Sequence, residues 1–216
     1  MRQLIVFDWD GTLMDSLARI CSCMQAAALD LQIEPASDLN IKGIVGLALD
    51  LAIQTLHPEL SLEQVNQMRE RYSHHYVVAD QTPSSFFPGV ESMLSSLHRK
   101  GHFLSVATGK SRRGLDRVFS ACGVAGLFHS SRCADEAKSK PAPDMLLELL
   151  NLHGVTPDQA VMVGDTDFDL AMAAAAGVSS IGVSWGAHEL TRLEKHNPVA
   201  IVESVAALSD LLHQEY

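Results

Sequence analysis

The stretch IVFDWDGTLMDS, residues 5–16, decides the fold, because an apolar run ends there in two acids one residue apart. Charged side chains seldom follow a buried strand so closely without a function. The run LIVFD, residues 4–8, has the composition of such a strand. Asp8 and Asp10 would then stand at its carboxyl end, which is the edge of a parallel sheet where ligands bind.

Short apolar runs alternate with helical patterns from Ser85 onward. This alternation predicts an α/β fold, in which a parallel sheet carries helices on both faces in three Rossmann-like layers. The expected strands cover 4–8, 102–108, 160–165, 179–185 and 199–204. The expected helices cover 112–122, 142–154, 168–177 and 204–214, the first three of them closing at glycines.

Residues of about 15 to 84 contain no convincing strand, and they show helical patterns at 17–31, 39–56 and 61–78. The last pattern opens with Ser61 followed three residues later by Gln64, which is a capping box. An all-helical insertion after a first strand is the layout of a cap. We therefore expect a core made of residues 1–14 and 85–216, and a helical cap made of residues 15–84.

The composition limits the partners. The 216 residues carry a formal net charge of −10, which argues against nucleic acid or an anionic membrane as the main partner. An anionic small substrate would need local positive charge or a metal to offset that field. The N-terminus lacks a signal-peptide pattern, no stretch could span a bilayer, and the four cysteines lack disulfide or zinc spacing. We expect a cytoplasmic monomer or homodimer.

Polar residues gather where the predicted strands end. Asp8 and Asp10 follow the first strand, Thr108, Gly109 and Lys110 follow the second, and Asp165 with Asp169 follows the strand at 160–165. The loop KSKPAPD adds Lys138 and Lys140 just before a helix. A turn explains any one of these residues, but it does not explain the whole set.

Phosphoryl transfer is the chemistry that uses such a set. Clustered carboxylates bind Mg²⁺, which prefers oxygen ligands. A carboxylate can also act as the nucleophile, while a second acid protonates the leaving oxygen and later deprotonates water. A hydroxyl, backbone amides and an ammonium group stabilise charge on the phosphoryl oxygens.

Four motifs in order resemble those of the haloacid dehalogenase-like superfamily. DWDGTLMDS resembles its first motif, SVATGK is similar to the second, KPAPD matches the lysine-bearing third, and VGDTDFDL matches the fourth. FFPGVESMLSSL resembles the helix that follows the family's helical cap. The resemblance covers nearly the whole chain and implies a Mg²⁺-dependent enzyme that acts on a small phosphorylated metabolite.

The resemblance implies the roles of the acids. Asp8 matches the nucleophile, and Asp10 matches the general acid and base, with its backbone carbonyl on the metal. Asp8 and Asp165 would ligate the metal, while Asp169 would act through a water molecule or through Lys140.

The phosphate-binding residues follow in the same way. Thr108 and Lys140 would hold the phosphoryl group, and the backbone amides around Gly11, Thr12 and Gly109 could add donors. Lys138 is the rival for the third-motif lysine, but Lys140 directly precedes the proline, as the family lysine does.

Within the family, Asp10 argues against a dehalogenase and against a phosphonoacetaldehyde hydrolase, which lack an acid at that position. The pattern is closest to the phosphoglycolate-phosphatase-like group, and a phosphomutase of the β-phosphoglucomutase type is the alternative. Arg19 and Lys42 are the first cap residues to test for a contact to a second anionic group on the substrate. Arg112 and Arg113 are alternative contacts, and Trp185 with Gly186 could line the mouth of the site or pack on the sheet.

Overall fold

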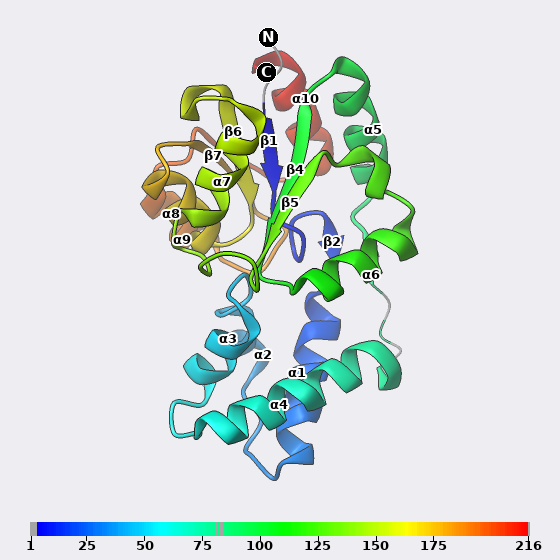
Figure 1. The fold of residues 1–216 in the computed structure, drawn as a ribbon, viewed down its shortest axis with the longest axis vertical. Coiled ribbons are helices and arrows are strands. Elements are labelled where there is room, and N and C mark those ends of the chain that lie inside the picture. The colour runs from blue at the N-terminus through cyan, green and yellow to red at the C-terminus, as the bar shows by residue number, and fades with distance from the viewer. Residues whose placement is uncertain (1–3, 81, 83, 216) are drawn as a thin grey trace.

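The computed structural model describes residues 4–80, 82 and 84–215. A six-stranded parallel sheet forms its centre, in the order β5-β4-β1-β6-β7-β8 (Figure 1). Phe7 of the central strand is in register with Val106 on one side and Val163 on the other. The strands are β1 (Leu4–Phe7), β4 (Phe103–Thr108), β5 (Ser130–Cys133), β6 (Ala160–Gly164), β7 (Ser179–Val183) and β8 (Ala200–Val202).

Helices cover both faces of the sheet, which confirms the predicted layers. Successive side chains of β1 point to opposite faces, so Ile5 and Phe7 join one apolar cluster while Leu4 and Val6 join the other. The first cluster includes apolar residues of α5 and α10, and the second includes those of α7 and α8. The helices of this part are α5 (Val90–Lys100), α6 (Arg112–Cys122), α7 (Asp144–His153), α8 (Asp167–Ala175), α9 (Leu190–Leu193) and α10 (Val205–Glu215).

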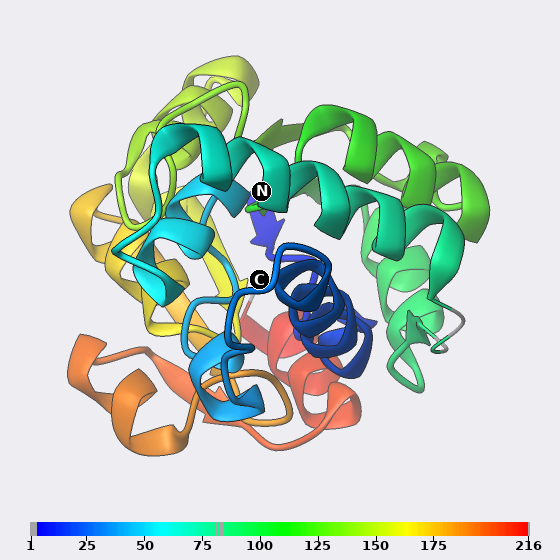
Figure 2. The same ribbon diagram turned by 90° about the horizontal axis from the view of Figure 1, so that it is seen from below.

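A second group of helices lies beyond one end of the sheet (Figure 1). It comprises α1 (Leu17–Asp30), α2 (Asp38–Lys42), α3 (Leu49–Leu56), α4 (Leu62–His74) and the π-helical segment His75–Ala79. These residues, 17–79, are called the helical unit below. They bury an apolar cluster of their own, which includes Met24, Ile41, Ile53 and Met68. Seen from below, α4 crosses the face of the molecule beside α1 (Figure 2).

The chain enters and leaves the helical unit through a short antiparallel pair. β2 (Met14–Asp15) pairs with β3 (Ser85–Phe86), and Met14 is opposite Phe86. The pair holds the two connecting segments side by side, close to the expected boundaries at 14/15 and 84/85. The division into core and cap stays a prediction.

Two of the differences from the sequence-based expectations have a direct physical reason. The helical pattern at 39–56 forms two helices, because the intervening turn includes Gly46 with φ of +100°, a conformation that a helix cannot contain. β5 was not expected, since its sequence SSRC has no apolar alternation; it forms an edge strand by pairing with β4. The capping box of Ser61 and Gln64 is confirmed at the start of α4.

Among the described residues, no helix combines the length and the apolar character that a membrane crossing needs. The four cysteines are free thiols, and all except Cys122 are buried.

Candidate functional site

Asp8 lies at the carboxyl end of the central strand. Its backbone N–H donates to the Val163 carbonyl at 2.9 Å, which continues the β1–β6 pairing one residue beyond the strand. Thr108 ends the neighbouring β4, and Asp165 directly follows β6 on the other side. All three side chains are buried. The register of the sheet therefore brings together residues that are up to 157 positions apart, Asp8 to Asp165.

Lys140 lies between two of the acids of the site, Asp8 and Asp169. Its side chain is fully buried, and its Nζ donates to Asp8 Oδ1 and to Asp169 Oδ1, both at 2.6 Å. Of the two predicted options for Asp169, the structure places it in direct contact with the lysine. The rival Lys138 is 78% exposed and pairs with Asp144 at 3.3 Å. Only Lys140 of the two reaches the acids.

Three carboxylates crowd around this lysine. Oxygens of Asp8, Asp165 and Asp169 all lie within 4.8 Å of one another. Burial raises the pKa of Asp8 well above its usual range, although the Lys140 charge opposes that shift. Burial, with the nearby Asp169 carboxylate, raises the pKa of Asp165 to about 7. The site thus holds more buried negative charge than one lysine offsets.

This donor set fits a hard divalent cation. Asp8 Oδ2 is buried and has no hydrogen-bond partner within the described part of the chain. A buried carboxylate oxygen without a partner is costly, and a cation beside the three acids would relieve both the crowding and the missing contact.

The Asp165 carboxylate is clamped from two sides. Thr12 Oγ1 donates to its Oδ1 and the Ala187 N–H donates to its Oδ2, each at 2.7 Å. A Cβ added at Gly11 or at Gly186 would come within 2.2 Å of this side chain. Both positions therefore need glycine, which explains the glycine after Trp185 without a contact to substrate.

Asp10 has different surroundings from Asp8. Ser16 Oγ donates to its Oδ1 at 2.5 Å, and Lys110 Nζ lies 2.8 Å from its Oδ2. The Lys110 ammonium also lies 3.4 Å from the Tyr76 hydroxyl and 4.8 Å from the centre of that ring. Asp10 thus has its own cation and lies outside the three-carboxylate group. The sequence placed Lys110 at the strand end, but it gave no signal for its partner.

The fourth motif folds around Asp169. Thr166 Oγ1 donates to Asp169 Oδ2 at 2.7 Å, and the two residues form the capping box at the start of α8. The remaining oxygen of Asp169 accepts from Lys140. Asp169 therefore orients the lysine while it begins the helix.

A cavity of about 670 Å³ opens between the helical unit and the core, and Asp10 lies on its wall. Neither Arg19 nor Lys42, the first residues of the helical unit to test for a contact to a second anionic group, lines it. Arg19 instead donates to the backbone carbonyls of Tyr76 at 2.7 Å and Asp80 at 3.0 Å, so it braces the π-helical segment. Gly109 lies on the cavity wall, where the Gly46 and Leu47 carbonyls approach it.

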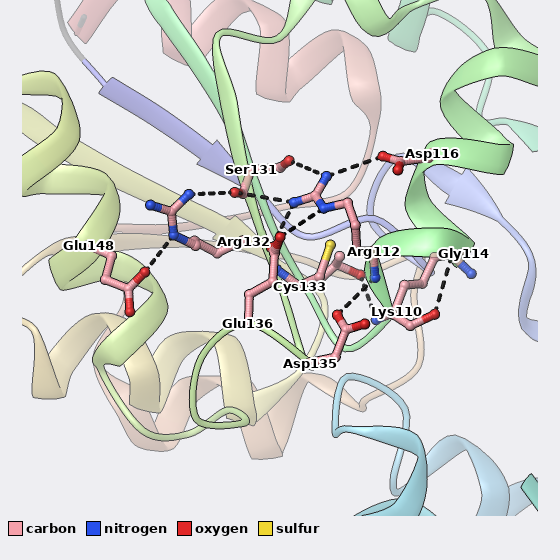
Figure 3. Close-up of polar contacts among 12 residues, drawn as sticks. Lys110, Arg112, Gly114, Asp116, Ser131, Arg132, Cys133, Asp135, Glu136 and Glu148 are labelled. Carbon is pink, nitrogen blue, oxygen red and sulfur yellow. Dashed lines mark hydrogen bonds and ion pairs between the residues drawn. The ribbon is translucent and has the colours of Figure 1, made fainter.

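Two further candidates serve the fold. Arg112 donates to Glu136 through Nε at 2.9 Å and Nη2 at 2.7 Å, and to Ser131 Oγ at 2.9 Å (Figure 3). These contacts tie the start of α6 to β5 and the following loop. The Trp185 indole donates to the Thr12 carbonyl at 3.2 Å and packs edge-on against Phe87, which supports a packing role.

Comparison with known proteins gives a consistent picture. A family model described as haloacid dehalogenase-like hydrolase matches residues 5–183. The chain is 34% identical over 217 residues to the "Probable phosphatase IndB" of Dickeya dadantii, with 99% of this chain and 94% of that protein covered. It is 29% identical over 218 residues to a phosphoglycolate phosphatase of Vibrio vulnificus, with 97% and 96% covered. The chain belongs to the haloacid dehalogenase-like hydrolase family.

Solved structures share the fold. A predicted phosphoglycolate phosphatase of Haemophilus somnus superposes with a TM-score of 0.89 at 24% identity, over 98% of both chains. A hydrolase of Pseudomonas syringae also reaches 0.89, at 22% identity, over 100% of this chain and 99% of that one. At these identities the likeness speaks for the fold alone.

Proposed function

We propose that this haloacid dehalogenase-like hydrolase is a phosphatase, a Mg²⁺-dependent phosphomonoester hydrolase that acts on a small phosphorylated metabolite through phospho-Asp8. The observation that carries the proposal is the buried contact of Lys140 with Asp8 and Asp169, beside Asp165. A buried carboxylate held by a lysine, at the edge of the sheet where ligands bind, has the surroundings of a nucleophile. The names of the similar proteins support the same activity.

The metal would be held by the Asp8 and Asp165 side chains and the Asp10 carbonyl, with Asp169 close by. When bound, Mg²⁺ supplies positive charge that offsets the buried carboxylates and the charge on phosphoryl oxygens. The unpartnered Oδ2 of Asp8 supports this assignment.

The chemistry of the chain then runs in two steps. The Asp8 carboxylate forms a bond to phosphorus, and the bond from phosphorus to the ester oxygen breaks as Asp10 donates its proton to that oxygen. Water then attacks the phosphorus of phospho-Asp8, Asp10 takes its proton, and the bond to the Asp8 oxygen breaks. Lys140 and Thr108 balance the charge on the phosphoryl oxygens in both steps.

The test is phosphate release from 4-nitrophenyl phosphate with Mg²⁺. Asp8→Asn should abolish turnover, and Asp10→Asn should slow it by about 10²-fold, the usual scale for a lost general acid or base. Asp158→Asn, at an exposed position outside the cavity, is the matched control and should be neutral. With a ³²P-labelled ester and acid quenching, the label should appear on the peptide that contains Asp8.

Unchanged activity in Asp8→Asn would refute the mechanism. An isomerised sugar phosphate formed without free phosphate would identify a mutase in place of the hydrolase.

A further inference from the structure

The cavity beside Asp10 is electrostatically unlike the rest of the molecule. Its wall carries four cations, Arg69, Lys110, Arg113 and Arg117, against three acids, Asp10, Asp50 and Asp135, in a chain whose net charge is −10. The local charge of the wall is therefore +1. Local positive charge inside a negative protein raises the concentration of anionic ligands there.

The pairing of these charges singles out two arginines. Arg69 pairs with Asp50 and Lys110 pairs with Asp10, each at 2.8 Å. Asp135 accepts from the backbone N–H of Arg112 at 2.8 Å (Figure 3).

Arg113 and Arg117 remain: their side chains have neither a hydrogen bond nor an ion pair to any residue that the structure describes. Arg112 and Lys110 differ from these two arginines, because Arg112 donates hydrogen bonds to Glu136 and Lys110 pairs with Asp10.

Helix geometry places the two guanidinium groups on one side. Residues four apart share a helix face, and the rise between them is about 6 Å. α6 begins two residues after Lys110, on the segment that follows Thr108 at the end of β4. Arg113 lies in the first turn and Arg117 in the next, so the pair leads away from the phosphate-binding residues along the cavity wall.

The helical unit supplies apolar lining to the same cavity. Ile20 and Met24 of α1, Ile44 and Val45 after α2, and Ala52 of α3 all line it. The volume of about 670 Å³ lies in the range of roughly 300–1,000 Å³ that is typical of pockets for drug-sized ligands. A two-carbon leaving group such as glycolate would leave most of this space to water.

We propose that Arg113 and Arg117 form a subsite for an anionic group on the far end of the leaving group, and that the leaving group has an apolar body longer than two carbons. This inference rests on the proposed function. It assigns substrate selection to a core helix, α6, in place of Arg19 and Lys42 of the helical unit.

Two esters of equal size test the charge. The probes are 4-carboxyphenyl phosphate and 4-carbamoylphenyl phosphate, which differ in the charge at the far end. The wild-type protein should favour the carboxylate in kcat/KM, and Arg113→Gln with Arg117→Gln should lower the ratio of the two values about tenfold, the scale for two exposed ion pairs. The double variant Arg71→Gln with Arg99→Gln removes the same charge at exposed positions outside the cavity, and it should leave the ratio unchanged.

The length of the leaving group is tested with alkyl esters. The kcat/KM for 6-(phosphonooxy)hexanoate should exceed that for phosphoglycolate by at least about tenfold, because its four additional methylene groups can lie on the apolar wall. A higher kcat/KM for phosphoglycolate than for 6-(phosphonooxy)hexanoate would overturn the inference that the leaving group has a long apolar body. If the Arg113 and Arg117 double variant keeps the wild-type ratio, because it loses kcat/KM equally on both aryl esters or on neither, the subsite is overturned. If none of the four esters is hydrolysed, the result counts against the proposed function and not against the subsite.

Discussion

Replacing Lys140 with methionine removes the one cation that the structure places against the Asp8 and Asp169 carboxylates. Methionine keeps most of the apolar stem, so the packing of the buried side chain changes little, while both 2.6 Å contacts of the ammonium are lost. The variant leaves three carboxylates buried within 4.8 Å of one another without that charge. Breaking a buried ion pair by removing one partner costs about 3–5 kcal/mol of unfolding free energy.

The pH dependence has a definite sign. In wild type, Asp169 and Asp8 raise the pKa of Lys140 against the opposing effect of burial, so the lysine stabilises the fold throughout the range below its ordinary pKa of about 10.4. In the variant, the Lys140 charge no longer opposes the raised pKa of Asp8. Below the raised pKa of this carboxyl, the folded variant binds a proton more tightly than the folded wild type, in which the Lys140 charge lowers that pKa. Its stability deficit should therefore shrink as the pH falls from 7 towards 4.

Urea unfolding followed by circular dichroism measures this deficit at pH 7 and pH 5, with EDTA and with Mg²⁺. Lys138→Met is the matched control, since Lys138 is largely exposed, and it should stay within about 0.5 kcal/mol of wild type. Mg²⁺ should narrow the deficit of Lys140→Met, because a bound cation offsets the same carboxylates. A deficit below about 1 kcal/mol at pH 7 in EDTA would refute the view that this lysine compensates the buried acids.

Two further outcomes follow from the geometry. Gly186→Ala should lower kcat/KM at least tenfold in the phosphatase assay, because the new Cβ would meet Asp165 at 2.2 Å. Gly126→Ala is the control and should be neutral, since a Cβ there would have nothing within 4 Å. Equal activity of the two variants would contradict the view that Gly186 makes room for the Asp165 carboxylate. Hydrogen bonds, first from Ser22, lower the pKa of Asp80 to about 2, so this carboxylate stabilises the fold above the unfolded pKa of about 3.9 and loses that effect as the pH falls through 2. Melting temperatures of wild type and Asp80→Asn should thus differ at pH 6 and converge near pH 2, and a constant difference would contradict this.

Most of the sheet and its acidic edge could be predicted, because the residues of each strand and the acids that follow it are neighbours in the sequence. The run LIVFD needs only its neighbours to be read as a strand, and the ends of parallel strands meet at one edge of a sheet. That rule brings Asp8, Thr108 and Asp165 together without knowledge of the packing. The proline after Lys140 likewise distinguished it from Lys138, and the structure buries only the former.

Elements without a local signal were missed for the same reason. The sequence SSRC of β5 is polar, and it becomes a strand because β4 offers an unpaired edge beside it. The pattern at 39–56 has helical spacing throughout, but Gly46 takes a positive φ where the chain turns towards the core.

The sequence alone determined five of the six strands of the sheet, the order of the motifs, and the identity of the acids at the strand ends and of the lysine in the loop before α7. Only the tertiary structure decided which cations face the cavity. Arg19 donates its hydrogen bonds to backbone carbonyls, whereas Arg113 and Arg117 line the wall. The physical reason is that a strand end is marked in the sequence by the end of a short apolar run, which is a local pattern. The surroundings of an arginine depend instead on how the helical unit packs against the core, and that packing is the sum of many contacts between residues distant in sequence.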